Sequence, residues 1–257
     1  MTSALQHALS MASEFPVTDV VQTETGFQCC LTVALPSGLS IPFELEVRPG
    51  FPDHLVVKER PPGRLPRCCP ERHITPRNEF CLHWVYGDPQ PIVDAESARR
   101  WWALLWDFLT RQEAAAKLRR WPGPVRAHGK AVSHQDRAER SAAKLGADVL
   151  ASVHEAQFVT HLDQRRGRNR IELQRNGTLV NRIQLPNRTL TDRRAPCLCP
   201  QGVQSNAPIG GCEDHAEALA SLVDALHRWS GAEKEYFNQL RGAGVVCCQT
   251  LDRCPLR

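Results

Sequence analysis

Two kinds of hydrophobic pattern alternate along the first 60 residues. Apolar side chains recur at helical spacing over residues 3–14, which predicts a short amphipathic helix. Residues 20–35 and 40–49 are instead rich in β-branched and apolar side chains, and Pro-Ser-Gly separates them, so we expect an antiparallel hairpin. A third strand is expected at residues 54–59. The first part of the chain therefore predicts a helix followed by an antiparallel meander.

The longest periodic segment covers residues 95–121 and predicts a strong helix that ends at Trp-Pro-Gly-Pro. Five apolar side chains in it follow an i, i+3, i+4, i+7, i+8 pattern, which is typical of a face buried in a core. These side chains are Trp101, Leu104, Leu105, Phe108 and Leu109. The helix closes a first domain of residues 1–121, which is an ordinary domain size.

Between the third strand and this helix, closely spaced prolines exclude regular structure. The prolines are Pro61, Pro62, Pro66 and Pro70. They lead into residues 68–88, which show neither a helical nor a strand period and contain Cys81. We expect an irregular surface loop here, and loops held on a rigid scaffold often carry the chemistry of a protein.

The second half of the chain divides into two segments of different character. Residues 122–190 read as a linker with one helix at 134–150 and short strands joined by an Asn-Gly turn. Residues 191–257 form a cysteine-rich tail with a helix expected at 214–229.

Composition narrows the function classes. No run of about 18 apolar residues and no charged stub followed by an apolar block is present, so neither a membrane span nor a secretory signal is indicated, and we expect a cytoplasmic protein. The eleven cysteines then read as thiols, a nucleophile or metal ligands rather than a disulfide framework. The net charge is only +4, and the basic run at 165–170 reads as a solvated hairpin turn, which argues against a dedicated nucleic-acid binder.

The residues around Cys81 resemble the ubiquitin-conjugating family. That family has a His-Pro-Asn tripeptide whose asparagine lies eight residues before a nucleophilic cysteine followed by leucine. Cys81 is followed by Leu82, and the residue eight positions earlier is His73, where the family has asparagine. A histidine at this place, and the Arg-Trp-Pro near the end of the long helix, are similar to divergent bacterial relatives. The resemblance covers residues 1–121 and implies an α+β, UBC-like fold.

This resemblance implies an acyl-carrying enzyme. Cys81 would hold a ubiquitin-like protein, or another protein C-terminus, as a thioester, because a thiolate is both a strong nucleophile and a good leaving group. His73 would donate a hydrogen bond to the oxyanion or accept the proton of the attacking amine. His83 has no role in the family pattern, and Cys68 and Cys69 are expected to be inert thiols.

The implied partners are a ubiquitin-like protein and its activating enzyme, and the bacterial relatives point to a ubiquitin-like or antiphage defence system with a target such as a defence nucleotidyltransferase. The competing hypothesis is a catalytically inactive UBC-like adaptor that binds ubiquitin-like or defence proteins. A third hypothesis is a zinc-stabilised nucleic-acid module that uses the basic run at 165–170.

The tail predicts a structural zinc site, since zinc takes four thiolate or imidazole ligands tetrahedrally. Its first ligand group resembles the SEC-C zinc motif but has a longer gap between its two ligand pairs and two residues between the last cysteine and the histidine. The candidate ligands are Cys197, Cys199, Cys212, His215, Cys247, Cys248 and Cys254.

Overall fold

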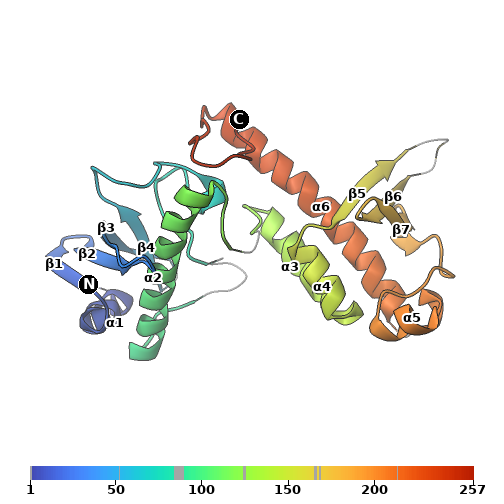
Figure 1. The fold of residues 1–257 in the computed structure, drawn as a ribbon, viewed down its shortest axis with the longest axis horizontal. Helices are drawn as coiled ribbons and strands as arrows, with labels where there is room; N and C mark the ends of the chain where they lie inside the picture. Colours follow the sequence, from blue (N-terminus) through green and yellow to red (C-terminus); the bar gives the residue numbers. More distant parts are fainter. Residues whose placement is uncertain are drawn as a thin grey trace. The chain divides into compact units, whose positions relative to one another are not determined.

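The computed structural model describes the chain except for residues 1, 52, 84–89, 124–125, 165–166, 168 and 213. The chain divides into two compact units, which are described separately (Figure 1). Unit 1 comprises Met1–Gly123 together with Arg241–Arg257, and unit 2 comprises Pro124–Leu240. Among the described residues, every helix is too short or too polar to cross a membrane.

Both units combine helices with an antiparallel sheet, so the fold class is α+β. The elements of unit 1 are α1 (Ser3–Met11), η1 (Ala12–Glu14), β1 (Val17–Thr23), β2 (Gly26–Ala34), β3 (Ser40–Gly50), β4 (His54–Glu59), η2 (Pro70–Arg72) and α2 (Ala95–Leu118). Those of unit 2 are α3 (Ala131–Leu145), α4 (Ala147–His154), β5 (Phe158–Asp163), β6 (Arg170–Arg175), β7 (Thr178–Gln184), β8 (Thr189–Leu190), α5 (Pro200–Ser205), η4 (Ile209–Gly211) and α6 (His215–Gly242), whose last residues belong to unit 1.

The sheet of unit 1 is a meander in the order β1-β2-β3-β4. The stretch at 20–35 was predicted as one strand, but it contains the end of β1 and all of β2, joined by a tight turn in which Thr23 pairs with Gly26. Glycine suits this position because a Cβ on Gly26 would lie 2.0 Å from the carbonyl oxygen of Val47 on β3. The third strand, β4, has the predicted bounds.

One face of this sheet is covered by helices. Buried side chains alternate along β3, where Ile41, Phe43, Leu45 and Val47 point into the core, as expected for a sheet with one covered face. Helices α1 and α2 pack against each other and supply further members of the same core. This core is the scaffold for the irregular loop that follows β4.

Helix α2 begins at a capping box in which the Asp94 side chain accepts from the Ser97 backbone, and it ends before Arg119, whose φ is 53°. Four of the five residues predicted for its core face are buried. The exception is Leu104, which is 37% exposed, while the neighbouring Trp102 is fully buried and its indole N–H donates to the Ala8 carbonyl at 2.9 Å. The apolar face is therefore rotated from Leu104 toward Trp102.

Unit 2 has its own core, and it includes the region that the sequence predicted as a linker with a helix and short strands. The helix predicted at 134–150 is two helices, α3 and α4, because the chain breaks at Gly146 with a φ of 133°. The predicted short strands are confirmed as β5, β6 and β7, and Asn176 and Gly177 both have the positive φ that the hairpin turn requires. Arg170, the last residue of the basic run at 165–170, begins β6, and residues 165, 166 and 168 of the run lie outside the described residues.

The final helix is longer than predicted. Helix α6 continues from His215 to Gly242, through the region where the sequence predicted its end at residue 229. Gly231 lies within it, with open space where a Cβ would be, and the residues after it are good helix formers. The tail after α6 belongs with unit 1, which includes Arg241–Arg257. The three-segment division 1–121, 122–190 and 191–257 stays a prediction.

Candidate thioester site and metal centre

The loop that precedes Cys81 is closed by a short backbone bridge. Cys69 and Ile74 exchange two N–H to carbonyl hydrogen bonds, each 3.0 Å long. The bridge encloses the 3-10 turn η2 and places His73 at its end with a φ of 56°. The His73 N–H donates a hydrogen bond to the Pro70 carbonyl at 2.7 Å, which fixes the His73 backbone at the end of the turn.

Cys81 lies beside this turn. Its backbone N–H donates to the His73 carbonyl at 2.8 Å. The preceding residue, Phe80, is buried, and its N–H donates to the Val57 carbonyl on β4 at 2.8 Å. Cys81 is exposed, whereas the other ten cysteines are buried or half-buried. The arrangement presents one accessible thiol on a backbone that the sheet holds in place.

The His73 ring packs edge-on against Trp121, with ring centroids 4.8 Å apart. Trp121 follows the C-terminal end of α2 and also contacts Phe108 of that helix. The two features that pointed to bacterial relatives, the histidine and the Arg-Trp-Pro, therefore meet in space. His83 lies near this loop with its ring 6.3 Å from that of His54, and residues 84–88 of the predicted loop lie outside the described residues.

Arg72 holds the turn through buried hydrogen bonds, and the sequence alone did not single out this residue. It is 3% exposed, its Nε donates to the Gln112 side chain at 2.7 Å, and its Nη2 donates to the Gln112 carbonyl at 2.9 Å. The Gln112 amide in return donates to the Arg72 carbonyl at 2.6 Å. Burial lowers the pKa of Arg72. The sequence signal for this contact was Gln112, a polar residue at a position that lies on the otherwise apolar face of α2.

Three of the seven predicted metal ligands, Cys247, Cys248 and Cys254, belong to unit 1. Cys248 shares a hydrogen bond with Cys69, with the sulfur atoms 2.9 Å apart, and Leu251 packs with Cys69 and Ala115. Cys247 interacts with Cys254, and burial raises the pKa of Cys254 to about 11. Cys68 and Cys69 were predicted to be inert thiols, and the structure places the Cys69 sulfur next to that of a residue 179 positions away.

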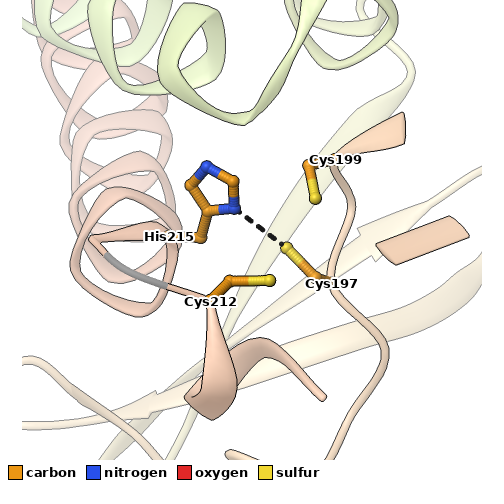
Figure 2. A group of neighbouring side chains, drawn as sticks. All are labelled: Cys197, Cys199, Cys212 and His215. Atoms are coloured by element: carbon orange, nitrogen blue, oxygen red, sulfur yellow. Dashed lines mark hydrogen bonds between the residues drawn. The ribbon is translucent and has the colours of Figure 1, made fainter. Parts of the chain in front are cut away.

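The remaining four predicted ligands form a cluster in unit 2. The ligand atoms of Cys197, Cys199, Cys212 and His215 all lie within 4.8 Å of one another (Figure 2). The Cys197 sulfur is 3.3 Å from Nδ1 of His215. Among the described residues, this is the one group of three or more such side chains close enough to share a metal ion.

Local structure explains why these side chains converge. Cys199 is the N-cap of α5, where its sulfur accepts from the Gly202 N–H at 3.2 Å, and Pro200 occupies the first turn. A Cβ on Gly202 would lie 2.4 Å from Cβ of Cys197, so glycine permits the close packing. His215 begins α6, and Cys212 directly follows η4.

The chemistry of this donor set fits zinc. Three sulfurs and one imidazole nitrogen would complete a tetrahedral shell around a zinc ion, which is the composition of a closed structural site. The hydrogen bond from Gly202 lowers the pKa of Cys199, which favours the thiolate that a metal requires. Burial raises the pKa of Cys197 to about 12. A cation would offset this cost, because it stabilises a coordinated thiolate.

Two family models match successive parts of the chain. Residues 18–123 match the prokaryotic E2 domain, and residues 127–256 match the cysteine-rich domain that lies C-terminal to the E2 domain. The first match contains Cys81 and His73, and the second contains the four-residue cluster and the three tail cysteines. Comparison with curated proteins and with solved structures produced no match.

Proposed function

The chain belongs to the family of prokaryotic E2 domains followed by a cysteine-rich domain, and from this we propose that it carries a ubiquitin-like protein as a thioester on Cys81 and transfers it to an amine. The observation that carries the proposal is the accessible thiol of Cys81. The Cys81 backbone is hydrogen-bonded to that of His73, and both residues lie within the match to the E2 domain. Unit 1 supports a UBC-like fold, since it runs from a helix through an antiparallel meander and an irregular loop to a long helix.

The reaction has two steps, and both need a good leaving group. The Cys81 thiolate attacks the carbonyl carbon of a thioester on an activating enzyme, and the tetrahedral intermediate expels that enzyme's thiolate. An amine then attacks the Cys81 thioester, loses its proton and expels the Cys81 thiolate. ATP is consumed by the activating enzyme and not by this chain. Such a carrier works where thiols stay reduced, so we place it in the cytoplasm.

His73 has two alternative roles in the second step. Its ring could donate a hydrogen bond to the oxyanion, a contribution worth about 10²–10³ in rate for such donors in other enzymes. It could instead accept the proton of the attacking amine, since an imidazole titrates near neutral pH. Packing against Trp121 limits the directions in which the ring can point. A pH profile of aminolysis separates the roles, because only the proton acceptor requires the neutral ring.

The metal would act on structure in this proposal. Cys197, Cys199, Cys212 and His215 would hold zinc and tie the start of α6 to the segment before α5. A closed shell of four protein ligands leaves no position for substrate, so a bound zinc would contribute folding energy there. Unit 2 would then serve recognition of a target, such as a nucleotidyltransferase in a bacterial defence system.

The test captures adducts on a tagged Cys81→Ser variant expressed with the neighbouring genes of its native host. Serine converts a short-lived thioester into a longer-lived oxyester, which intact mass and peptide mapping identify. Wild type should carry a thiol-sensitive adduct at Cys81, Cys81→Ala should carry none, and Cys247→Ser should behave as wild type. If all four proteins are free of adducts while retaining partner binding, the protein is the non-catalytic UBC-like adaptor instead.

A further inference from the structure

A pair of thiols lies at the start of the loop that carries His73 and Cys81. The sulfurs of Cys69 and Cys248 are 2.9 Å apart, although the residues are 179 positions apart in the sequence. Both lie in unit 1. Cys69 forms the backbone bridge with Ile74, and Cys248 lies in the segment after α6. A disulfide needs its sulfurs at about 2.05 Å, so less than about 1 Å of movement would bond them.

The two members of the pair differ in access. Cys69 is 1% exposed, whereas Cys248 is half-buried, so a small oxidant reaches Cys248 first. The Cys248 sulfur lies 3.1 Å from the Thr250 hydroxyl, and the same hydroxyl accepts from Nη1 of Arg72 at 3.2 Å. A guanidinium so close favours a thiolate on the accessible sulfur.

A shared metal ion explains the pair less well. Zinc needs about four ligands, and among the described residues only the cluster in unit 2 brings three or more ligand atoms within 4.8 Å of one another. Cys68, Cys247 and Cys254 are all described, and none completes such a group around Cys69 and Cys248. Two facing thiols without further ligands are the arrangement that oxidises to a disulfide.

We propose that Cys69 and Cys248 form a reversible disulfide that fastens the C-terminal segment to the loop carrying His73 and Cys81. This site is separate from the thioester chemistry, and its existence does not depend on the proposed function. The oxidant is a peroxide, and a small thiol or a dithiol reductase reverses the bond.

The oxidation balances in two steps. The Cys248 thiolate attacks one oxygen of hydrogen peroxide and forms a sulfenic acid, and the departing hydroxide takes a proton to become water. The Cys69 thiol then attacks the Cys248 sulfur, the sulfur–sulfur bond forms, and the sulfenic hydroxyl leaves as a second water. Two thiols are oxidised by two electrons, and one peroxide is reduced to two waters.

The bond would act on the base of the candidate thioester loop. Cys69 and Ile74 flank the turn that ends at His73 and are hydrogen-bonded to each other, and the His73 carbonyl accepts a hydrogen bond from the Cys81 N–H. A covalent link at Cys69 therefore restrains the turn, and it prevents residues 247–254 from separating from unit 1. Reduction restores the freedom of both segments.

The experiment treats the reduced, full-length protein with a few equivalents of hydrogen peroxide, blocks remaining thiols with N-ethylmaleimide and maps tryptic peptides without reduction. Cleavage after Arg67, Arg72, Arg241 and Arg253 leaves Cys68 and Cys69 on one peptide and Cys247 and Cys248 on another. The neighbouring cysteines therefore provide matched controls. The cross-linked peptide pair should survive in Cys68→Ser and Cys247→Ser and disappear in Cys69→Ser and Cys248→Ser. Dithiothreitol should reduce the disulfide and separate the two peptides in wild type.

Three results would overturn the proposal. The first is a wild-type map without this peptide pair. The second is a pair that persists in Cys248→Ser, a variant of a half-buried residue that should fold normally. The third is a metal content that falls by one zinc per chain in Cys248→Ser while peroxide leaves wild-type Cys69 unmodified, which would show that the pair binds metal. Loss of adducts on Cys81 has no influence on either readout, so a failure of the proposed function is distinguishable.

Discussion

The buried contact between Arg72 and Gln112 provides the sharpest test of how the candidate thioester loop is held. Replacing Gln112 with leucine keeps the side chain's approximate volume and helix propensity but removes two hydrogen bonds. One is the 2.7 Å bond that Gln112 accepts from Arg72, and the other is the 2.6 Å bond that it donates to the Arg72 carbonyl. The remaining bonds of Arg72, to the Gln112 carbonyl and to Thr250, do not depend on this side chain.

The expected cost follows from the loss of buried partners. A hydrogen bond to a charged group contributes about 1.5–3 kcal/mol, and a buried carbonyl left without its donor costs about 1–3 kcal/mol. Both atoms lie in a protected place, because Gln112 is fully buried and Arg72 is 3% exposed. Gln112→Leu should therefore lower the free energy of unfolding by about 3–5 kcal/mol, a large fraction of the usual 5–15 kcal/mol.

Tryptophan fluorescence during urea unfolding measures this loss selectively. Five of the six tryptophans precede residue 124, so the signal reports mainly on unit 1; they are Trp84, Trp101, Trp102, Trp106 and Trp121. Gln22→Leu makes the same chemical change at an exposed strand position and should stay within about 0.5 kcal/mol of wild type.

A double-mutant cycle then tests the pairing itself. Adding Arg72→Met to Gln112→Leu removes the buried charge, so the double variant should be less destabilised than the sum of the single variants. A loss below about 1 kcal/mol for Gln112→Leu, or strict additivity in the cycle, would refute the argument that this pair holds the loop.

Two further predictions concern unit 2. Cys212→Ser should reduce the zinc content, measured by elemental analysis, by one ion per chain and make unit 2 more sensitive to proteolysis. The control Ser205→Ala, at an exposed position, should change neither property. Equal zinc contents in the two variants would contradict the zinc site. Burial would raise the pKa of Asp224, but the hydrogen bond and charge of Arg228, with the charge of Arg137, outweigh it and hold that pKa below its usual value. A depressed folded-state pKa gives stability that is present above about pH 4 and is lost as the pH falls through the folded value. Asp224→Asn should therefore be less stable than wild type at neutral pH, with the difference shrinking in acid, and a difference in circular-dichroism melting that does not change with pH would contradict this.

Local sequence patterns were sufficient for elements whose neighbours in space are also neighbours in the chain. The strand predicted at residues 54–59 is β4 with the same bounds, and Asn176-Gly177 predicted the β6–β7 hairpin, because both depend on residues a few positions apart. Predictions failed where a single glycine changed the outcome. Gly146 divides a predicted helix, Gly231 does not end one, and Gly26 closes a turn inside a predicted strand.

The candidate sites divide in the same way. The spacing of eight residues and the Cys-Leu pair identified Cys81 and His73, and the structure joins their backbones directly. The roles of both side chains remain predictions. Of seven predicted metal ligands, the structure groups the four that lie within a short stretch and places the three tail cysteines in unit 1.

By itself, the sequence determined the element order of unit 1, the cysteine in its irregular loop and the cysteine-rich character of the C-terminal half. These features depend on side-chain period, proline content and spacing, which are local properties. Only the tertiary structure decided that Cys248 lies against Cys69, that Gln112 pairs with the buried Arg72, and that the segment after α6 belongs to unit 1. Both side-chain contacts join residues at least 40 positions apart, so only the assembled core brings the partners within reach, and the buried Arg72 and Gln112 groups depend on that contact because a buried polar group without a partner is costly.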